Sequence, residues 1–282
     1  MNQAFLLKVV LLFMLSTGLL LVPAGCERSQ PSSQTQKVPA DLQTTVDQFV
    51  RAFETLDALK VLDFYTDDFI SGTGRPKNDI PSVLTQFRSN QVALKVESAE
   101  VAEATPAEAT LKTRFRLRYK DRFRDLGEGD VVVTDVLMHS LRKDADHWKI
   151  YKDERIATYR DGRFGEQPPN VEVEVPAKLP TNLEYPVKVK VRTQKDAIYQ
   201  VLVGNYVEDV GILPPPDIDR ILPEDGVLEA NLLPNPQGFS EIVRVTVLVA
   251  DRAGGGLVGA TMVSKFVHGA PRTKSATPKE AT

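Results

Sequence analysis

The spacing of apolar residues changes once along this chain, and that change constrains the fold more than any single motif does. Between residues 41 and 65 the apolar side chains recur every three or four positions, as along one face of an α-helix. From residue 93 onward they alternate with polar side chains, as in half-buried β-strands. Helices followed by such strands predict an α+β fold, with the helices packed on one face of an antiparallel sheet.

The spacing over residues 41–65 predicts a pair of helices broken near Asp57. Asp79-Ile80-Pro81-Ser82 predicts the start of a further helix, with a capping residue and a proline in its first turn, and this helix runs to about Asn90. Strands are expected over residues 93–102, 109–124, 130–142 and 148–159, joined by hairpin turns at 125–129 and 143–146.

Short segments in this region carry a family likeness. Val50-Arg51-Ala52-Phe53 and the stretch from Asp57 to Phe69 resemble the opening helices of the nuclear-transport-factor-two-like superfamily, which includes ketosteroid isomerases and polyketide cyclases. His147-Trp148-Lys149-Ile150-Tyr151 resembles its closing strand. The resemblance covers about residues 41–160 and implies a cone-shaped barrel of helices on a curved antiparallel sheet. It implies no single function, because the superfamily holds enzymes and also members that only bind or dimerise.

Beyond residue 170 the sequence predicts a second domain of another class. Short apolar strands are separated by proline and glycine, as in an all-β sandwich. This part resembles an immunoglobulin-like domain in architecture, without the disulfide and buried Trp of antibody domains. The proline-rich segment 211–237 is predicted to be a long loop. The strands are expected over residues 171–175, 187–191, 197–206, 242–250 and 257–267.

The N-terminus predicts export. Residues 4–22 are almost all apolar, small residues follow, and the only cysteine of the chain, Cys26, stands at the end of this run. The pattern resembles a bacterial lipoprotein, which implies a signal peptide over residues 1–25 and acylation of Cys26, with palmitate among the usual acyl chains. Glu27 then favours the outer membrane, facing the periplasm. Two alternatives stay open: ordinary cleavage that leaves Gly25 first, and an uncleaved membrane span.

The predicted organisation therefore has five parts. A flexible tether (27–40) follows the signal peptide and Cys26, because its residues are polar and lack periodicity. The α+β domain (41–165), the sandwich (170–268) and a disordered tail (269–282) come next.

The net charge of −3 gives no case for nucleic-acid binding, and the three histidines have no spacing typical of metal ligands, so neither a metal nor a cofactor is expected.

Three residues are weak candidates for catalysis in the cone. Asp135 and His139 share one strand face, where a carboxylate can orient an imidazole, and Tyr65 with Asp135 can imitate the tyrosine and carboxylate of the isomerases. The alternative places Asp135 and His139 on the solvated face, with Val132 and Val136 turned inward. These weak candidates are outweighed by the absence of a catalytic motif in the sequence, so an enzyme is not the preferred interpretation.

A basic stripe is the best candidate for an interaction site. Its members occupy every second position of one predicted strand, so they project from one face. They are Lys112, Arg114, Arg116, Arg118, Lys120, Arg122 and Arg124. Either they pair with acids such as Glu97, Glu100, Asp130 and Asp153, or they bind an acidic protein, glycan or lipid headgroup.

The leading hypothesis is a non-enzymatic, membrane-anchored module of the cell envelope that binds a partner or forms a homodimer. The alternatives are a small-molecule binder that uses the α+β domain as its pocket, and a cyclase- or isomerase-like enzyme. A buried carboxylate with a raised pKa beside Tyr65 would favour the enzyme.

Overall fold

The computed structural model describes residues 38–72, 74–180, 183–207, 217–234 and 239–269, whose contacts form two compact units. Within these ranges the helical unit comprises residues 38–119 and 134–156, and the β-rich unit comprises residues 120–133 and 157–269. The predicted signal peptide, Cys26, most of the tether and nearly all of the tail lie outside the described residues.

The helices of the helical unit form where the apolar spacing predicts them. Helix α2 (Ala40–Glu54) and helix α3 (Ala58–Asp63) are separated by a break at which Leu56 has a φ of 52°. The carboxylate of Asp57 accepts a hydrogen bond from the backbone N–H of Lys60 at 3.3 Å and so caps α3. Helix α4 (Ile80–Ser89) follows a short 3₁₀ turn, η1 (Lys77–Asp79), and has a proline in its first turn.

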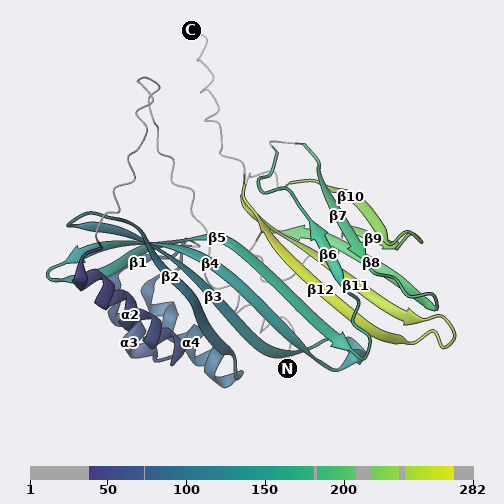
Figure 1. Cartoon of the computed structure of the whole chain (residues 1–282), viewed down its shortest axis with the longest axis horizontal. Helices are drawn as coiled ribbons and strands as arrows, with labels where there is room; N and C mark the ends of the chain where they lie inside the picture. Colours follow the sequence, from purple (N-terminus) through teal and green to yellow (C-terminus); the bar gives the residue numbers. More distant parts are fainter. Residues whose placement is uncertain (1–37, 73, 181–182, 208–216, 235–238, 270–282) are drawn as a thin grey trace, which may run out of the picture. The chain divides into compact units, whose positions relative to one another are not determined.

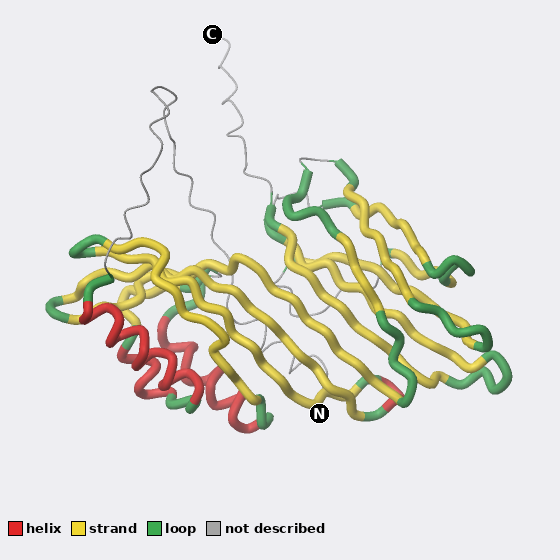
Figure 2. The backbone as a smooth tube through the Cα atoms, in the orientation of Figure 1, coloured by secondary structure: helices red, strands yellow, loops and turns green. Residues whose placement is uncertain are grey.

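A curved antiparallel sheet lies against these helices, which are red in Figure 2 and labelled in Figure 1. The strands β2 (Ala93–Ala104), β3 (Glu108–Arg122), β4 (Glu128–Asp144) and β5 (His147–Gly165) confirm the predicted meander. Strand β1 (Tyr65–Ile70) was not predicted, and it pairs in parallel with β5.

The alternation in β3 explains why sheet and helices stay together. Leu111, Phe115 and Leu117 are buried, whereas the residues between them are basic or polar. The ring of Phe53, from α2, lies 5.4 Å from the ring of Phe115. Full burial of such a side chain contributes about 1.5–3 kcal/mol, so one apolar face per element is enough to hold the layers together.

The β-rich unit takes in one end of each of the long strands β3, β4 and β5. The C-terminal part of β5 (Tyr159–Gly165) pairs antiparallel with β12 (Leu257–Val267). Next in order come β11 (Glu241–Asp251), β8 (Ala197–Tyr206) and β9 (Ile218–Ile221). A separate small sheet among the described residues contains β10 (Val227–Leu232), β7 (Tyr185–Val191) and β6 (Val171–Glu174).

Side chains from both sheets of this unit share one apolar cluster, which includes Val189 of β7, Val203 of β8 and Val245 of β11, all fully buried. The region is therefore β-rich, with a small sheet in addition to the large one. Its immunoglobulin-like identity stays a prediction.

Two features of this unit differ from the expectation. The segment 211–237, expected to be a loop, contains β9 and β10 within its described residues. Strand β12, predicted in the second domain, pairs with β5, predicted in the first, and one end each of β3, β4 and β5 lies in the β-rich unit. An alternating pattern predicts a strand, but which strand it pairs with depends on the pairing register and on the segments that connect the strands.

Candidate functional site

The weak catalytic candidates meet in the helical unit. Tyr65 on β1 and both Asp135 and His139 on β4 line the same small cavity. Their side chains are buried, so the interpretation that placed Asp135 and His139 on the solvated face is wrong. Val132 and Val136, which that interpretation turned inward, are half-buried on the other face. Both phases of this strand hold apolar residues, and alternation alone therefore did not identify the inner face.

Asp135 and His139 do not form the pair that their spacing suggested. A carboxylate oxygen of Asp135 lies 3.5 Å from the guanidinium of the buried Arg155 on β5. The ring Nε2 of His139 is 2.8 Å from the hydroxyl of Thr113 on β3. Burial lowers the pKa of His139 to about 3, so the ring is neutral at physiological pH. A neutral imidazole held by a threonine is a packed core group.

Asp153 is a further titratable group of this interior, and its predicted place among the partners of the basic stripe is wrong. It is 2% exposed and accepts a hydrogen bond from the backbone N–H of Gly72 at 3.0 Å. Burial raises the pKa of its carboxyl to about 6, against the opposing effects of this hydrogen bond and of Arg155. Burial, together with the charge of Asp153, raises the pKa of Tyr65 well above its ordinary value.

The reason for this error is a shift in the alternation of β5. Trp148 and Ile150 are buried, and a strict period of two would place residues 152 and 154 inside. Instead the buried phase moves by one residue and continues at Asp153 and Arg155, near the place where the register of β1 on β5 is irregular. No sequence signal marks this irregularity.

The interior has little free space. The cavity beside Tyr65, Asp135 and His139 measures about 40 Å³. Small-molecule sites usually occupy about 300–1,000 Å³, whereas a single water needs roughly 10–15 Å³. As it stands, this cavity holds no substrate of the size that a cyclase or isomerase requires.

The basic stripe lies on the opposite, solvent-facing side of β3 and is partly neutralised. Arg114 and Arg116 both contact the carboxylate of Glu97, at 2.9 and 3.2 Å. Lys120 contacts Asp130 at 2.7 Å. These cross-strand pairs match the interpretation of the stripe as a solvated face. Lys112, Arg118 and Arg122 share that face of the strand.

Arg124 is not a member of the stripe. The strand ends at Arg122, and Arg124 begins the short 3₁₀ turn η2 (Arg124–Leu126) with a φ of 40°. Its side chain therefore leaves the alternation of the strand, and the guanidinium lies over the ring of Phe123, 5.6 Å from its centre.

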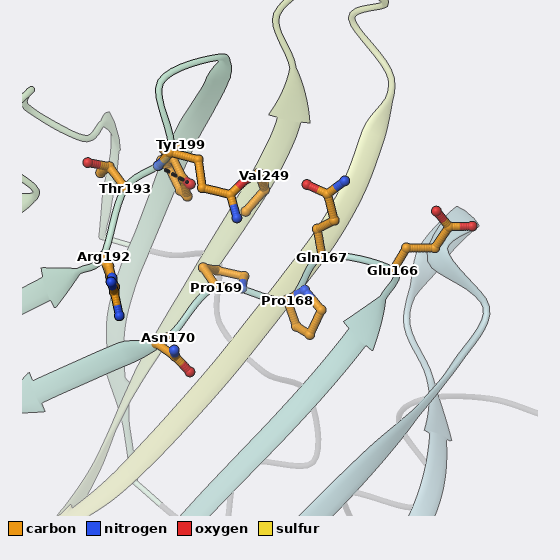
Figure 3. Close-up of a pocket in the computed structure, with 10 residues that line it drawn as sticks. Glu166, Gln167, Pro168, Pro169, Asn170, Arg192, Thr193, Tyr199 and Val249 are labelled. Atoms are coloured by element: carbon orange, nitrogen blue, oxygen red, sulfur yellow. Dashed lines mark hydrogen bonds between the residues drawn. The ribbon is translucent and has the colours of Figure 1, made fainter.

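A larger pocket lies in the β-rich unit and was not predicted. It measures about 630 Å³. Its walls are the linker from β5 to β6 (residues 166–170) and the β7–β8 loop (residues 192–194), and Tyr199 and Val249 complete the lining (Figure 3). The wall residues are mostly exposed and polar, whereas Tyr199 and Val249 are buried members of the shared apolar cluster. The lining therefore combines polar side chains on its walls with buried apolar ones.

Hydrogen bonds fix the linker wall to β12. The backbone N–H groups of Glu166 and Gln167 both donate to the carbonyl of Val258, at 3.1 and 3.2 Å. The hydroxyl of Thr261 donates to the carbonyl of Pro169 at 2.7 Å. A Cβ atom at Gly259 would stand 2.2 Å from the carbonyl oxygen of Gln167, so the linker can lie this close only because residue 259 is a glycine.

The loop wall is held equally firmly. The backbone N–H of Gln194 donates to the hydroxyl of Tyr199 at 2.9 Å, the dashed line in Figure 3. The backbone N–H of Arg192 donates to the carbonyl of Asn170 at 3.4 Å, which ties the loop to the linker. The pocket is thus formed by anchored backbone on both sides. Residues 166–169 stand only as the gap between the two predicted domains, and no signal in the sequence predicts that the linker and the loop meet.

Within the described part of the chain, no cluster of three or more His, Cys, Asp or Glu residues is arranged to hold a metal ion. Over the same residues, no helix combines the length and the apolar composition that crossing a membrane requires.

No protein-family model and no curated protein matches this chain. Solved structures resemble it over about residues 40–170. A Bdellovibrio bacteriovorus protein is 19% identical, with a TM-score of 0.33, and the match covers 41% of this chain and 38% of that one. This chain therefore spans less than half of the Bdellovibrio protein.

Two smaller proteins match the same part. An NTF2-like protein of unknown function from Pseudomonas putida is 12% identical, with a TM-score of 0.29, over 41% of this chain and 83% of that one. A Caulobacter vibrioides protein with a cystatin-like fold is 13% identical, with a TM-score of 0.30, over 41% and 85%. Likenesses at this level carry no argument about function. The α+β architecture rests on the helices and the large antiparallel sheet described above.

Proposed function

We propose that this protein is a non-enzymatic binding module of the bacterial cell envelope, with its ligand site in the linker pocket of the β-rich unit. The observation that carries the proposal is the contrast in free space: about 630 Å³ between the linker and the β7–β8 loop, against about 40 Å³ beside Tyr65 and His139. A ligand of ordinary size fits the first space and not the second.

The lining of the larger pocket supports binding rather than chemistry. The hydroxyl of Tyr199, the aromatic group of the lining, accepts a hydrogen bond from the backbone N–H of Gln194 at 2.9 Å. Besides two prolines, the wall side chains are three amides, a hydroxyl, one acid and one base. No histidine, cysteine or pair of carboxylates lines the pocket, so its lining lacks the nucleophile–base and two-carboxylate pairings that commonly carry acid–base or nucleophilic catalysis.

Membrane attachment is the second part of the proposal, and it rests on the sequence alone. Cys26 stands directly after the apolar run of residues 4–22, and Glu27 follows it. A lipid on Cys26 would hold the protein at the outer membrane, facing the periplasm. Replacing Cys26 with Ser is expected to move the protein from the membrane fraction to the soluble fraction. Unchanged fractionation would reject the anchor.

In this proposal the β-rich unit is an immunoglobulin-like module that presents the pocket.

The binding proposal is tested by native mass spectrometry of the full chain, extracted from its own membranes in a mild detergent. We expect a reproducible adduct of small-molecule mass. Thr193→Trp, which places an indole in the pocket wall, is expected to remove the adduct. Thr44→Trp makes the same exchange on the exposed side of α2 and should keep it.

An adduct that survives Thr193→Trp but is lost on substitution beside the interior cavity would transfer the site to the helical unit. A clean mass for the unmodified chain, obtained repeatedly, would contradict the binding proposal.

A second candidate function is acid–base catalysis in the helical unit. One observation favours it: Asp153 is buried, has a pKa raised to about 6, and influences the pKa of Tyr65. The hydroxyl of Tyr65 and one carboxylate oxygen of Asp153 make no hydrogen bond to any described residue. This function requires the interior to open well beyond about 40 Å³. Turnover of a cyclic ketone or hydroxy-aromatic compound that is abolished by both Tyr65→Phe and Asp153→Asn would establish it.

A further inference from the structure

The linker pocket has two chemical zones that together restrict its ligand. Tyr199 and Val249 belong to the apolar cluster of the β-rich unit, and Pro168 and Pro169 add further apolar surface from the linker. Around them stand polar side chains from both walls, with Gln167 on the linker side and Thr193 on the loop side (Figure 3). A matching ligand combines apolar faces with polar edges.

The backbone of the pocket offers few hydrogen-bond donors. The N–H groups of Glu166 and Gln167 are engaged with β12, and residues 168 and 169 are prolines, which have none. The N–H groups of Arg192 and Gln194 are engaged with the linker and with a tyrosine hydroxyl. An extended peptide is usually bound through a ladder of backbone hydrogen bonds along a strand edge, and these walls supply no such ladder.

Recognition therefore depends on side chains, and these are mainly neutral. Gln167, Asn170 and Gln194 carry amides, each with donors and an acceptor, and Thr193 carries a hydroxyl with the same dual capacity. One amide oxygen is already used, since the guanidinium of Arg163 donates to Asn170 at 3.3 Å. Groups that both donate and accept are the natural partners of hydroxyls, which do the same.

The pocket has no excess of charge. Glu166 contributes one negative charge and Arg192 one positive charge, so the formal charges of the lining cancel. A strongly anionic or cationic ligand would bring a charge that the lining does not balance, and its transfer from water would be unfavourable.

We propose that the linker pocket binds a neutral saccharide, with the C–H faces of a sugar ring against the proline and tyrosine surface and its hydroxyls bonded to the amides and the threonine. The proposal rests on the proposed function, because it names the ligand class of that same pocket. Its volume of about 630 Å³ suits a short oligosaccharide better than a long polymer.

The test titrates the full chain with neutral saccharides, maltotriose and N,N′-diacetylchitobiose, and with trialanine as the peptide probe. The detergent must be a polyoxyethylene ether, since glycoside detergents present sugars themselves. Native mass spectrometry reads the bound fraction. At least one saccharide is expected to bind, and the double variant Gln167→Ala/Gln194→Ala is expected to weaken binding about tenfold, as two lost hydrogen bonds imply. Gln43→Ala on α2 should leave it unchanged.

The outcomes separate the two proposals. Saccharide binding that the double variant weakens and Gln43→Ala preserves supports the inference. Saccharide binding that the double variant leaves intact overturns it, because the site then lies elsewhere. If trialanine binds and the saccharides do not, the ligand class is wrong while the pocket remains a binding site. If no probe binds, and the extracted protein carries no adduct sensitive to Thr193→Trp, both proposals fail.

Discussion

Two properties that usually occur together in a functional site lie in different regions of this protein. The interior of the helical unit has side chains with shifted pKa values, and the linker pocket of the β-rich unit has the free volume. The interior holds the groups with perturbed pKa values, Asp153, His139 and Tyr65, in a space of about 40 Å³. The linker pocket has about 630 Å³ and includes none of these three residues. A perturbed pKa reports burial, and burial alone does not make a site.

The difference lies in how each space is built. Strands β3 and β4 close the interior with alternating side chains that pack on α2, and the rings of Phe49 and His139 stand 5.5 Å apart. The linker pocket is formed by two connecting segments that backbone hydrogen bonds hold in place. Connecting segments on a rigid scaffold tend to carry binding sites, whereas packed sheet faces carry stability.

The largest effect is expected at Gly259, against which the linker wall of the pocket packs. A Cβ atom there would meet the linker backbone at 2.2 Å, so Gly259→Ala must displace the linker. We expect a loss of about 3 kcal/mol or more in the free energy of unfolding, together with loss of the ligand. Chemical denaturation and native mass spectrometry measure the two losses.

The control for this variant is Gly256→Ala, where an added Cβ atom meets nothing within 4 Å. It should leave both stability and binding unchanged. If Gly259→Ala is equally harmless, the linker does not rest on β12 as described.

The second largest effect is the pH dependence of stability at His139, which tests whether water reaches the interior of the helical unit. His139 has a pKa lowered from 6.5 to about 3, so folding favours the neutral ring and stability falls as pH drops below 6.5. His139→Gln keeps a partner for Thr113 without a titrating ring. Between pH 7.5 and pH 4, the variant should lose about 3 kcal/mol less than the wild type. Equal losses would mean that His139 is charged and hydrated in the fold.

The smallest effect concerns Asp153 and has the opposite sign. Its pKa is raised from 3.8 to about 6, so the protonated form is favoured in the fold and stability decreases as pH rises through this window. Relative to Asp153→Asn, the wild type should lose about 2 kcal/mol between pH 4 and pH 7. Denaturation at both pH values measures it. Asp67→Asn is the control, because Lys77 lowers the pKa of the exposed Asp67 and the pH trend should reverse.

Much of the fold was predictable because local patterns specify local elements. The break at Asp57, the helix that begins at Ile80 and the strands β2 to β8, β11 and β12 follow from apolar spacing, caps and turn residues. The site was less predictable. The candidates Tyr65, Asp135 and His139 do converge, but Asp153 escaped notice because the alternation of β5 shifts after Ile150. No feature of the sequence predicted the linker pocket.

By itself the sequence determined the order of most helices and strands, the inward phase of β3 with its outward basic residues, and the place of Cys26 after an apolar run. These depend on neighbours within a few positions. Only the tertiary structure decided that β12 pairs with β5, that residues 166–170 meet the β7–β8 loop, and that the interior of the helical unit has little free space. Such features depend on contacts between residues far apart in the chain, which no local pattern encodes.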